Sequence, residues 1–233
     1  MRVAALVQAR TGSTRLPGKV LEDVGGIPLI AHVLRRLRAA RRVDEVVLAT
    51  TGQEADDALV EVARAEGVDA HRGPEHDVLT RFRGAAEAAG AEAVVRITGD
   101  CPLLDPAVVD RVVEALLDDP EPCDYASNVL RRTYPRGLDT EALWAKTLAR
   151  VDELATSAAA REHVTWFAYR ERPDLFRLRS VEIDDGRPDL DWSVDTAEDL
   201  ERIRTLVSLL ERPDEPVSWR GLIERAGIRP SPT

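Results

Sequence analysis

The sequence predicts an α/β protein with a mostly parallel sheet, and three observations lead to this fold class. Short apolar runs alternate with segments of helical periodicity from the N-terminus to about Pro120. Such alternation implies right-handed crossovers between parallel strands. The 233 residues are 44% hydrophobic, which is enough for a substantial core in one large domain. We therefore expect residues 1 to 233 to form a single domain.

Four apolar runs in the first half of the chain predict buried strands, and helical segments lie between them. The predicted strands are residues 3–7, 45–51, 68–71 and 93–98. In the helical segments, apolar residues recur at intervals of three and four, as on a helix that packs one face against a core. These segments are residues 27–37, 59–63, 78–86 and 108–117. Gly25 and Gly26 break the chain before the first helix, and Pro106 stands at the start of the last.

The pattern becomes less regular after Pro120. Residues 124–143 predict strands and loops without a clean repeat. Beyond them we expect a helix over 158–170, strands over 176–183 and 191–194, a helix over 200–210 and a frayed end over 229–233.

Composition excludes several classes of protein. The formal net charge of −10 repels nucleic acid, so any anion-binding site must be local. Cys101 and Cys123 are the only cysteines and lack the spacing of metal ligands, which argues against a disulfide scaffold. We see no signal peptide and no run long enough to cross a membrane. The sequence therefore predicts a cytoplasmic protein that binds neither nucleic acid nor a membrane.

Residues 10–19 form the most informative segment. They follow the first predicted strand, and ligands of open α/β sheets bind at the carboxyl ends of the strands. The segment carries Arg10, Arg15 and Lys19, a set of cations suited to a triphosphate. Gly12 allows the backbone to approach a phosphate closely. The alternative is a solvated basic turn.

Asp100 is the first candidate metal ligand. It follows a buried strand and Gly99, at the same edge of the sheet as the cationic loop. Mg²⁺ binds through one or two carboxylates and takes its other ligands from phosphates and water. Asp105 has a structural explanation, because it precedes Pro106 and can cap the next helix. Asp100 lies too far from that helix to cap it.

Asp195 is the candidate for a second carboxylate on the metal. It lies between the predicted strand 191–194 and a capping pair formed by Thr196 and Asp199. Asp191 has the same strand parity and remains the alternative ligand.

The segment 7–21 resembles the signature A-R-x-x-S-x-R-L-P-G-K of the cytidylyltransferases that activate acidic sugars, among them the CMP-KDO and CMP-acylneuraminate synthetases. The resemblance is strongest to the SpsF subgroup of spore-coat polysaccharide biosynthesis proteins. It covers the chain from residue 3 to about 205. Five further runs support it, at residues 72–79, 96–102, 134–139, 161–165 and 192–196.

This resemblance implies a three-layer α/β/α sandwich, the Rossmann-like fold of nucleotide-diphospho-sugar transferases with a mostly parallel mixed sheet. It implies that Asp100 and Asp195 hold Mg²⁺. It also implies that the basic loop binds the phosphates of CTP, with Lys19, Arg15 and Arg10 in catalytic positions. The nucleotide-binding residues would be Ala9, Arg10, Gly12, Ser13, Arg15, Lys19 and Asp77.

On the acceptor side, the resemblance assigns sugar-binding roles to Arg136, Asp139 and His163. A structural role is the alternative for His163. Thr165 stands where CMP-KDO synthetases have a glycine, and residues 134–137 replace their P-W-x-R segment, which argues against KDO itself as the acceptor. The resemblance also implies a homodimer, with residues 124–175 forming the sugar pocket and the dimer contact. The alternative for that segment is a plain surface excursion.

The predicted reaction is Mg²⁺-dependent transfer of CMP from CTP to an acidic sugar or related acceptor, with release of pyrophosphate, in the synthesis of surface polysaccharides. Three alternatives remain at this stage. The first is a nucleotidyltransferase that uses another nucleoside triphosphate. The second is a glycosyltransferase of related fold, for which residues 189–191 supply an Asp-x-Asp string. The third is a non-catalytic relative that binds a nucleotide.

Overall fold

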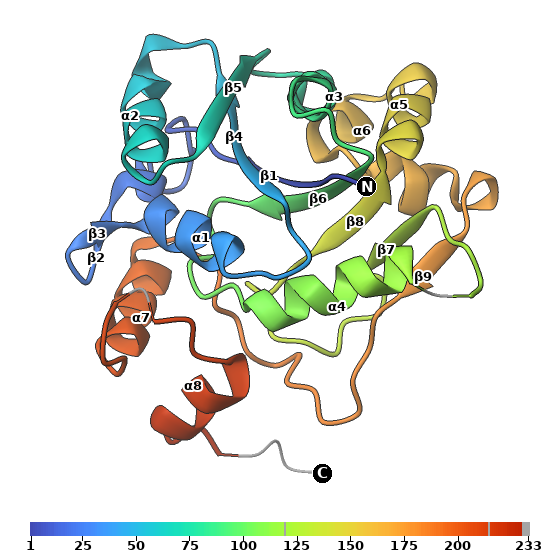
Figure 1. Cartoon of the computed structure of the whole chain (residues 1–233). Coiled ribbons are helices and arrows are strands. Elements are labelled where there is room, and N and C mark those ends of the chain that lie inside the picture. The colour runs from blue at the N-terminus through green and yellow to red at the C-terminus, as the bar shows by residue number, and fades with distance from the viewer. Residues whose placement is uncertain (119, 214, 230–233) are drawn as a thin grey trace.

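A mixed sheet runs through the middle of the molecule, and helices cover both of its faces (Figure 1). The computed structural model describes residues 1–118, 120–213 and 215–229. Within these residues the sheet has seven strands in the order β5-β4-β1-β6-β8-β7-β9. The strands are β1 (Val3–Gln8), β4 (Glu45–Thr51), β5 (Asp69–Gly73), β6 (Ala93–Thr98), β7 (Tyr125–Ser127), β8 (Glu141–Trp144) and β9 (Leu178–Ser180). A separate short hairpin pairs β2 (Asp23–Val24) with β3 (Ile27–Pro28).

The sheet is mostly parallel, as predicted. β1 pairs in parallel with β4 and β6, whereas β8 runs antiparallel to both β6 and β7. In the register, Gln8 lies opposite Ala49 on β4 and Thr98 on β6. The carboxyl ends of the three central strands therefore meet at one edge. This edge carries the loops that follow β1, β4 and β6.

Each face of the sheet has its own apolar core. One core lies under α1 (Leu29–Arg38), α2 (Asp57–Ala65) and α4 (Pro106–Leu117). The other lies under α3 (Val78–Ala88), α5 (Ala145–Leu154) and α6 (Ala158–His163). Alternate residues of β1 supply both, because Ala5 and Val7 face the first core and Ala4 and Leu6 face the second. These layers confirm the predicted three-layer fold class.

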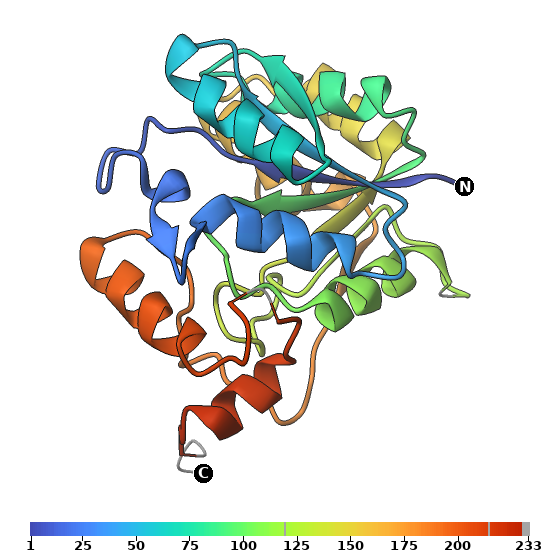
Figure 2. The ribbon, with the colours of Figure 1, turned by 60° about the vertical axis from the view of Figure 1, so that its left-hand side comes forward.

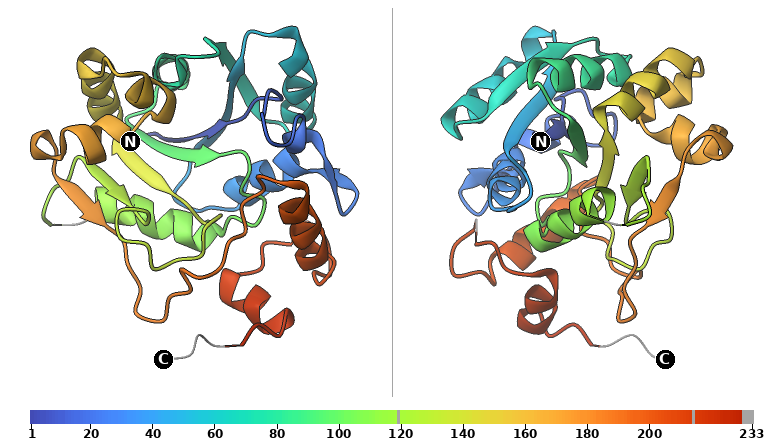
Figure 3. Two further views of the ribbon diagram at one scale, coloured as in Figure 1. Left: turned by 180° about the vertical axis from the view of Figure 1, so that it is seen from behind. Right: turned by 45° about the vertical axis from the view of Figure 1, so that its right-hand side comes forward.

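The C-terminal part of the chain forms a third apolar cluster. It contains α7 (Ala197–Val207) and α8 (Trp219–Arg225), which lie beside α1 and α4 (Figure 2). The segment 181–196 leads there from β9, at the far edge of the sheet, and passes the carboxyl end of β6 on its way to α7 (Figure 3). This path brings residues near position 195 to the strand ends.

The predicted helix over 158–170 is wrong as a continuous helix. α6 ends at His163 because Val164 adopts φ +53° and ψ −65°. The N–H of Thr165 then donates to the carbonyl of His163 at 2.6 Å, which closes a tight γ-turn. A π-helical turn, Phe167–Glu171, follows. The chain thus changes direction at a buried valine in a conformation that β-branched residues rarely adopt.

The predicted strand over 191–194 is also wrong, because this segment pairs with loops rather than with the sheet. Its one bridge joins Asp191 to Arg136, and the N–H of Trp192 donates to the Arg136 carbonyl at 2.9 Å. The N–H of Val194 donates to the carbonyl of Asp100, also at 2.9 Å. The segment is therefore fastened to the loop that follows β6.

Other boundaries differ by a few residues. The strand expected over 176–183 shortens to β9, and the helix expected over 200–210 is α7. Helices α5 and α8 and the β2–β3 hairpin were not predicted. The structure also has short helical turns at Lys19–Leu21, Glu54–Asp56 and Pro173–Leu175. The expected frayed end at 229–233 lies outside the described residues from 230 onward.

Gly137 gives a direct test of the packing between residues 134–137 and the segment 191–194. Its φ is +93°, and an added Cβ would lie 2.6 Å from the carbonyl carbon of Trp192. We expect Gly137→Ala to lower the free energy of unfolding by about 3 kcal/mol. The alanine would adopt a strained positive φ, and its Cβ would also force the backbone at Trp192 to move. The matched control is Gly67→Ala, with φ +65° and nothing near the new Cβ, which should cost only about 1–2 kcal/mol. Equal losses in urea denaturation would contradict the close contact.

Candidate functional site

A cleft of about 340 Å³ lies at the carboxyl ends of β1 and β6. Its lining includes the loop after β1 and residues 98–100, which follow or end β6. Glu162 and His163, at the end of α6, and Asp195, ahead of α7, complete the lining. Ala9, Arg10, Gly12, Ser13, Arg15 and Lys19, all predicted nucleotide-binding residues, line this cleft.

Lys19 joins the two predicted metal ligands. Its ammonium nitrogen Nζ lies 2.9 Å from Asp100 Oδ2, 2.9 Å from Asp195 Oδ1 and 2.6 Å from the carbonyl oxygen of Val194. The Lys19 side chain is only 10% exposed. Burial alone would lower its pKa, but the two carboxylates outweigh burial and raise the pKa above its usual value. Lys19 is therefore a buried and permanently charged cation. We call Lys19, Asp100 and Asp195 the Lys19 cluster.

Asp100 remains ionised for a related reason. Burial would raise the pKa of its carboxyl, but the charge of Lys19 and hydrogen bonds from Lys19 and Thr98 lower it overall. The neighbouring Cys101 is buried, and burial and the charge of Asp100 raise the pKa of its thiol well above the usual range. Asp100 is thus the anionic group at this point of the strand end, whereas Cys101 stays protonated.

The segments of the Lys19 cluster are far apart in sequence and are held by local structure. Lys19 begins a short helical turn directly after Gly18, whose φ is +74°. Asp195 precedes the capping box of α7, in which the Asp199 carboxylate accepts hydrogen bonds from the N–H groups of Thr196 at 2.8 Å and of Asp195 at 3.0 Å. The capping box predicted from sequence therefore also fixes the backbone of Asp195.

The structure places Asp195, and not Asp191, beside Asp100. Asp191 accepts hydrogen bonds from the backbone and side chain of Ser193 and lies 3.4 Å from the guanidinium of Arg136. It does not line the cleft. Of the two alternatives that the strand parity left open, Asp195 is the one with the geometry of a shared cation site.

An aspartate that the sequence analysis did not single out holds the start of the basic loop. Asp56 accepts hydrogen bonds from the N–H of Thr11 at 2.8 Å and from its hydroxyl at 2.7 Å. The Thr51 hydroxyl donates to the other carboxylate oxygen. Burial would raise the pKa of Asp56, but these donors lower it overall. No spacing rule marks Asp56, although its place just after a predicted strand is a usable signal.

Every cation of the basic loop has an acidic partner. Arg10 lies 3.4 Å from Glu75, and Arg15 lies 2.9 Å from Asp195. The Arg15 side chain is 64% exposed, so it can turn toward a ligand at little cost. The loop that the sequence marks as cationic is therefore neutralised by carboxylates from three other segments.

The part of the cleft lining at the end of α6 is connected to a polar network inside the fold. Thr165, just after the γ-turn, donates its hydroxyl hydrogen to Glu141. Glu141 also accepts from Arg96 at 2.7 Å, and Arg96 donates to the side-chain oxygen of Gln8 at 3.2 Å. Gln8 lines the cleft. The segment that carries the exposed ring of His163 is therefore connected, through Thr165, Glu141 and Arg96, to Gln8 in the cleft lining.

Asp77 lies outside the cleft lining. Its carboxylate caps α3 by accepting from the N–H of Thr80 at 3.0 Å, and it lies 2.6 Å from Arg161. Burial opposes ionisation, but hydrogen bonds from Arg161 and Thr80 lower the pKa overall. These contacts give Asp77 a structural role, and its nucleotide-binding role stays a prediction.

Arg136 and Asp139 also lie outside the cleft lining. Arg136 faces Asp191, and Asp139 accepts a two-pronged hydrogen bond from Arg132 at 2.6 and 2.8 Å. Of the three predicted sugar-binding residues, the structure brings only His163 to the cleft.

The donor set of the Lys19 cluster fits Mg²⁺ better than a transition metal. Among the described residues, no three His, Cys, Asp or Glu side chains converge as metal ligands. The cleft instead offers two carboxylates beside the loop that carries Arg10 and Arg15. Mg²⁺ needs no more from a protein when phosphates and water complete its shell.

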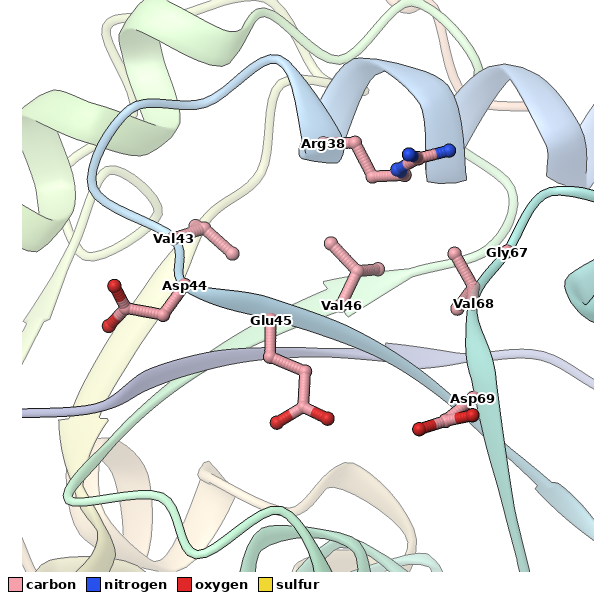
Figure 4. A pocket seen from close by; sticks show the side chains of 8 residues that line it. All are labelled: Arg38, Val43, Asp44, Glu45, Val46, Gly67, Val68 and Asp69. Carbon is pink, nitrogen blue, oxygen red and sulfur yellow. The ribbon is translucent and has the colours of Figure 1, made fainter.

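A second hollow, of about 280 Å³, lies at the opposite end of the strands (Figure 4). Two of its carboxylates, Asp44 and Glu45, have structural partners. Asp44 accepts from the N–H of Val3 at 2.7 Å, and Glu45 pairs with Arg2 at 2.7 Å. The hollow carries no cluster of reactive groups.

In the described part of the chain, every helix is too short or too polar to cross a membrane.

The chain is similar to several known proteins. The sequence profile of the cytidylyltransferase family matches residues 4–215. The spore coat polysaccharide biosynthesis protein SpsF of Bacillus subtilis (strain 168) is 34% identical over 91% of this chain and 90% of that protein. The structure of a cytidylyltransferase from Leptospira borgpetersenii superimposes with a TM-score of 0.92 at 30% identity, over 100% of this chain and 98% of that one. A CMP:2-keto-3-deoxy-manno-octonic acid synthetase in complex with CTP shares the fold, with a TM-score of 0.68 at 22% identity over 89% of this chain and 99% of that one.

Asp199 gives a pH-dependent test of the capping box that holds Asp195. Burial opposes its ionisation, but the N–H groups of Asp195 and Thr196 and the Arg202 guanidinium lower its pKa to about 2. Because the folded pKa lies below the unfolded one, the stabilisation is complete above pH 4 and is lost as the pH falls through about 2. We expect Asp199→Asn to lower the free energy of unfolding at pH 7 by on the order of 1–2 kcal/mol, after allowance for solvent screening.

The measurement is urea denaturation of wild type and variant between pH 2 and pH 7. The difference between the two should shrink toward the acid end. Glu198→Gln is the control, since Glu198 is exposed and lies outside the capping box. A difference that stays constant with pH would argue against an ionised Asp199 in the capping box.

Proposed function

This chain belongs to the cytidylyltransferase family, and from that premise we propose that it transfers CMP from CTP to a sugar or sugar-acid acceptor with release of pyrophosphate. One observation carries the proposal. Lys19, Asp100 and Asp195 converge at the strand ends beside the loop that bears Arg10 and Arg15. This arrangement offers cations to a triphosphate and carboxylates to a divalent cation within one cleft.

In the proposed reaction, an acceptor hydroxyl displaces pyrophosphate from the α-phosphorus of CTP. Arg10, Arg15 and Lys19 bind the triphosphate and stabilise the charge that develops on the leaving pyrophosphate. Gly12 and Ser13 contribute backbone contacts in the same loop, where the position of a Gly12 Cβ is free of neighbouring atoms. The catalytic contribution of the protein is positioning and charge neutralisation.

We propose that Asp100 and Asp195 hold Mg²⁺. Bound there with the nucleotide, Mg²⁺ would neutralise phosphate oxygens and orient the α-phosphate. The two carboxylates supply the anionic oxygens that such a site needs, and the bond from Val194 N–H to the Asp100 carbonyl keeps their segments together.

The acceptor enters from the side of Glu162 and His163 in this proposal, because these residues line the cleft from an element other than the basic loop. Similarity to SpsF supports an acceptor used in surface polysaccharide synthesis. Thr165 stands where the similar run of CMP-KDO synthetases has a glycine, which favours an acceptor other than KDO. A homodimer and a cytoplasmic location also remain proposals.

No observation favours the glycosyltransferase alternative. In the Asp-x-Asp string, Asp189 pairs with Arg187 at 2.6 Å, and Asp191 faces Arg136. Both lie outside the cleft lining. Because the Lys19 cluster is intact, a non-catalytic relative that only binds a nucleotide is the weaker alternative.

A pyrophosphate-release assay tests the reaction. Purified protein with Mg²⁺ is combined with each of the four nucleoside triphosphates and a panel of 2-keto sugar acids and neutral sugars. We expect release with CTP and at least one acceptor. Lys19→Ala should reduce the rate by about 10²–10³, since it removes a cation from the leaving group. Lys146→Ala, which changes the exposed lysine near Trp144, should leave the rate unchanged. Release with another triphosphate but not with CTP would reject the proposal.

The metal dependence of the same assay tests the choice between the two aspartates. Asp195→Asn should raise the Mg²⁺ concentration needed for half-maximal rate by about tenfold or more, because it removes a carboxylate ligand. Asp191→Asn should leave this concentration unchanged, even if it alters the KM for the acceptor. The reverse pattern would assign the metal to Asp191.

A further inference from the structure

The three hydrogens of the Lys19 ammonium are fully used. An ammonium has three donors and no acceptor. Lys19 Nζ has three oxygen neighbours, on Asp100, Asp195 and the carbonyl of Val194, at 2.6 to 2.9 Å. In this state Lys19 has no donor left for a phosphate. It can contact a triphosphate only by giving up one of these three partners.

The same contacts engage the two carboxylates that would hold a metal. Nζ lies on Oδ2 of Asp100 and on Oδ1 of Asp195, so a Mg²⁺ ion held by both residues would lie next to the ammonium. An ammonium and a divalent cation that share the same two carboxylates repel each other strongly in a partly buried cleft. Lys19 and the metal therefore compete for the two carboxylates.

A triphosphate removes this competition. It offers new anionic oxygens to Lys19 and to Arg15, which also lies on Asp195. Once both cations turn to phosphate, Asp100 and Asp195 are left as two like charges. Their segments cannot separate freely, because the N–H of Val194 bonds to the Asp100 carbonyl. The pair then needs another cation.

We propose that Lys19 acts as an internal counter-cation that blocks the metal site until the nucleotide binds, so that CTP and the divalent cation bind with positive coupling. This inference rests on the proposed function. By linkage, the coupling is reciprocal: each ligand strengthens the binding of the other by the same factor. The bond from Lys19 to the Val194 carbonyl competes with neither ligand, and it is the contact that Lys19 can keep in both states.

The test is a titration of the protein with Mn²⁺ in the absence of nucleotide. Electron paramagnetic resonance of the free Mn²⁺ measures how much Mn²⁺ has bound. Wild type should bind Mn²⁺ weakly. Lys19→Met removes the competing charge and keeps a side chain of similar length. We expect the Mn²⁺ affinity of this variant to be higher than that of wild type by about tenfold or more. Its affinity for CTP, measured by calorimetry without an acceptor, should fall by a similar factor. The two affinities thus move in opposite directions, which simple damage to the cleft would not produce.

Two controls sharpen this result. Lys146→Met removes the other lysine of the chain, which is exposed, and should change neither affinity. Lys19→Arg keeps the charge and should keep Mn²⁺ binding weak. Should Lys19→Met fail to fold, Lys19→Gln carries the same expectation. Mn²⁺ affinity that is unchanged or weaker in the neutral variants would overturn the inference.

The coupling is measured separately in wild type, by titrating CTP with and without Mg²⁺. Tighter CTP binding with the metal supports the inference, and equal binding contradicts it. Failure of wild type to bind CTP under either condition would instead reject the proposed function, whatever the Mn²⁺ result. The two failures are therefore distinguishable.

Discussion

The ion pairs of Lys19 connect three parts of this fold that lie far apart in sequence. Asp100 is 81 residues from Lys19, and Asp195 is 176 residues from it. One ammonium binds both, along with the carbonyl of Val194, and thereby fastens the loop after β1 to the loop after β6 and to the entry of α7. Breaking one arm would leave a partly buried charge without its partner, which costs far more than the loss of a surface ion pair. The cleft therefore depends on this contact for its shape as well as its charge.

Local charge balance explains how an acidic chain can carry a strongly basic loop. The net charge of −10 repels anions at long range, but the basic loop concentrates three cations at one strand end. Glu75, Asp100 and Asp195 neutralise these cations. In the proposed function, a triphosphate would replace some of these carboxylates as the partners of the cations. Such an exchange of partners costs less than the creation of an unpaired charge in a buried place.

The part of the cleft lining that contains His163 is adjacent to a strained backbone turn at Val164 and to a buried polar network. Val164 has a positive φ that a β-branched residue seldom adopts, and such conformations persist only where the surroundings fix them. Here the hydroxyl of Thr165 is held by Glu141, which is paired with Arg96 inside the sheet. The second apolar core thus gives way to polar side chains toward the strand ends. This change from apolar to polar packing lies at the boundary between the apolar core and the cleft.

Most regular elements in the first half of the chain, and the charged loop after the first strand, follow from the sequence alone. The strands at 45–51 and 93–98 match β4 and β6 residue for residue, because a buried strand needs only a short apolar run bounded by turns. The parallel arrangement then placed Lys19 and Asp100 at one edge by topology alone. The tertiary structure was needed to bring Asp195 rather than Asp191 to Lys19, to pair Asp77 with Arg161 and to end α6 at His163. These outcomes depend on which distant side chains meet, and a local pattern contains no information about distances between segments more than 80 residues apart.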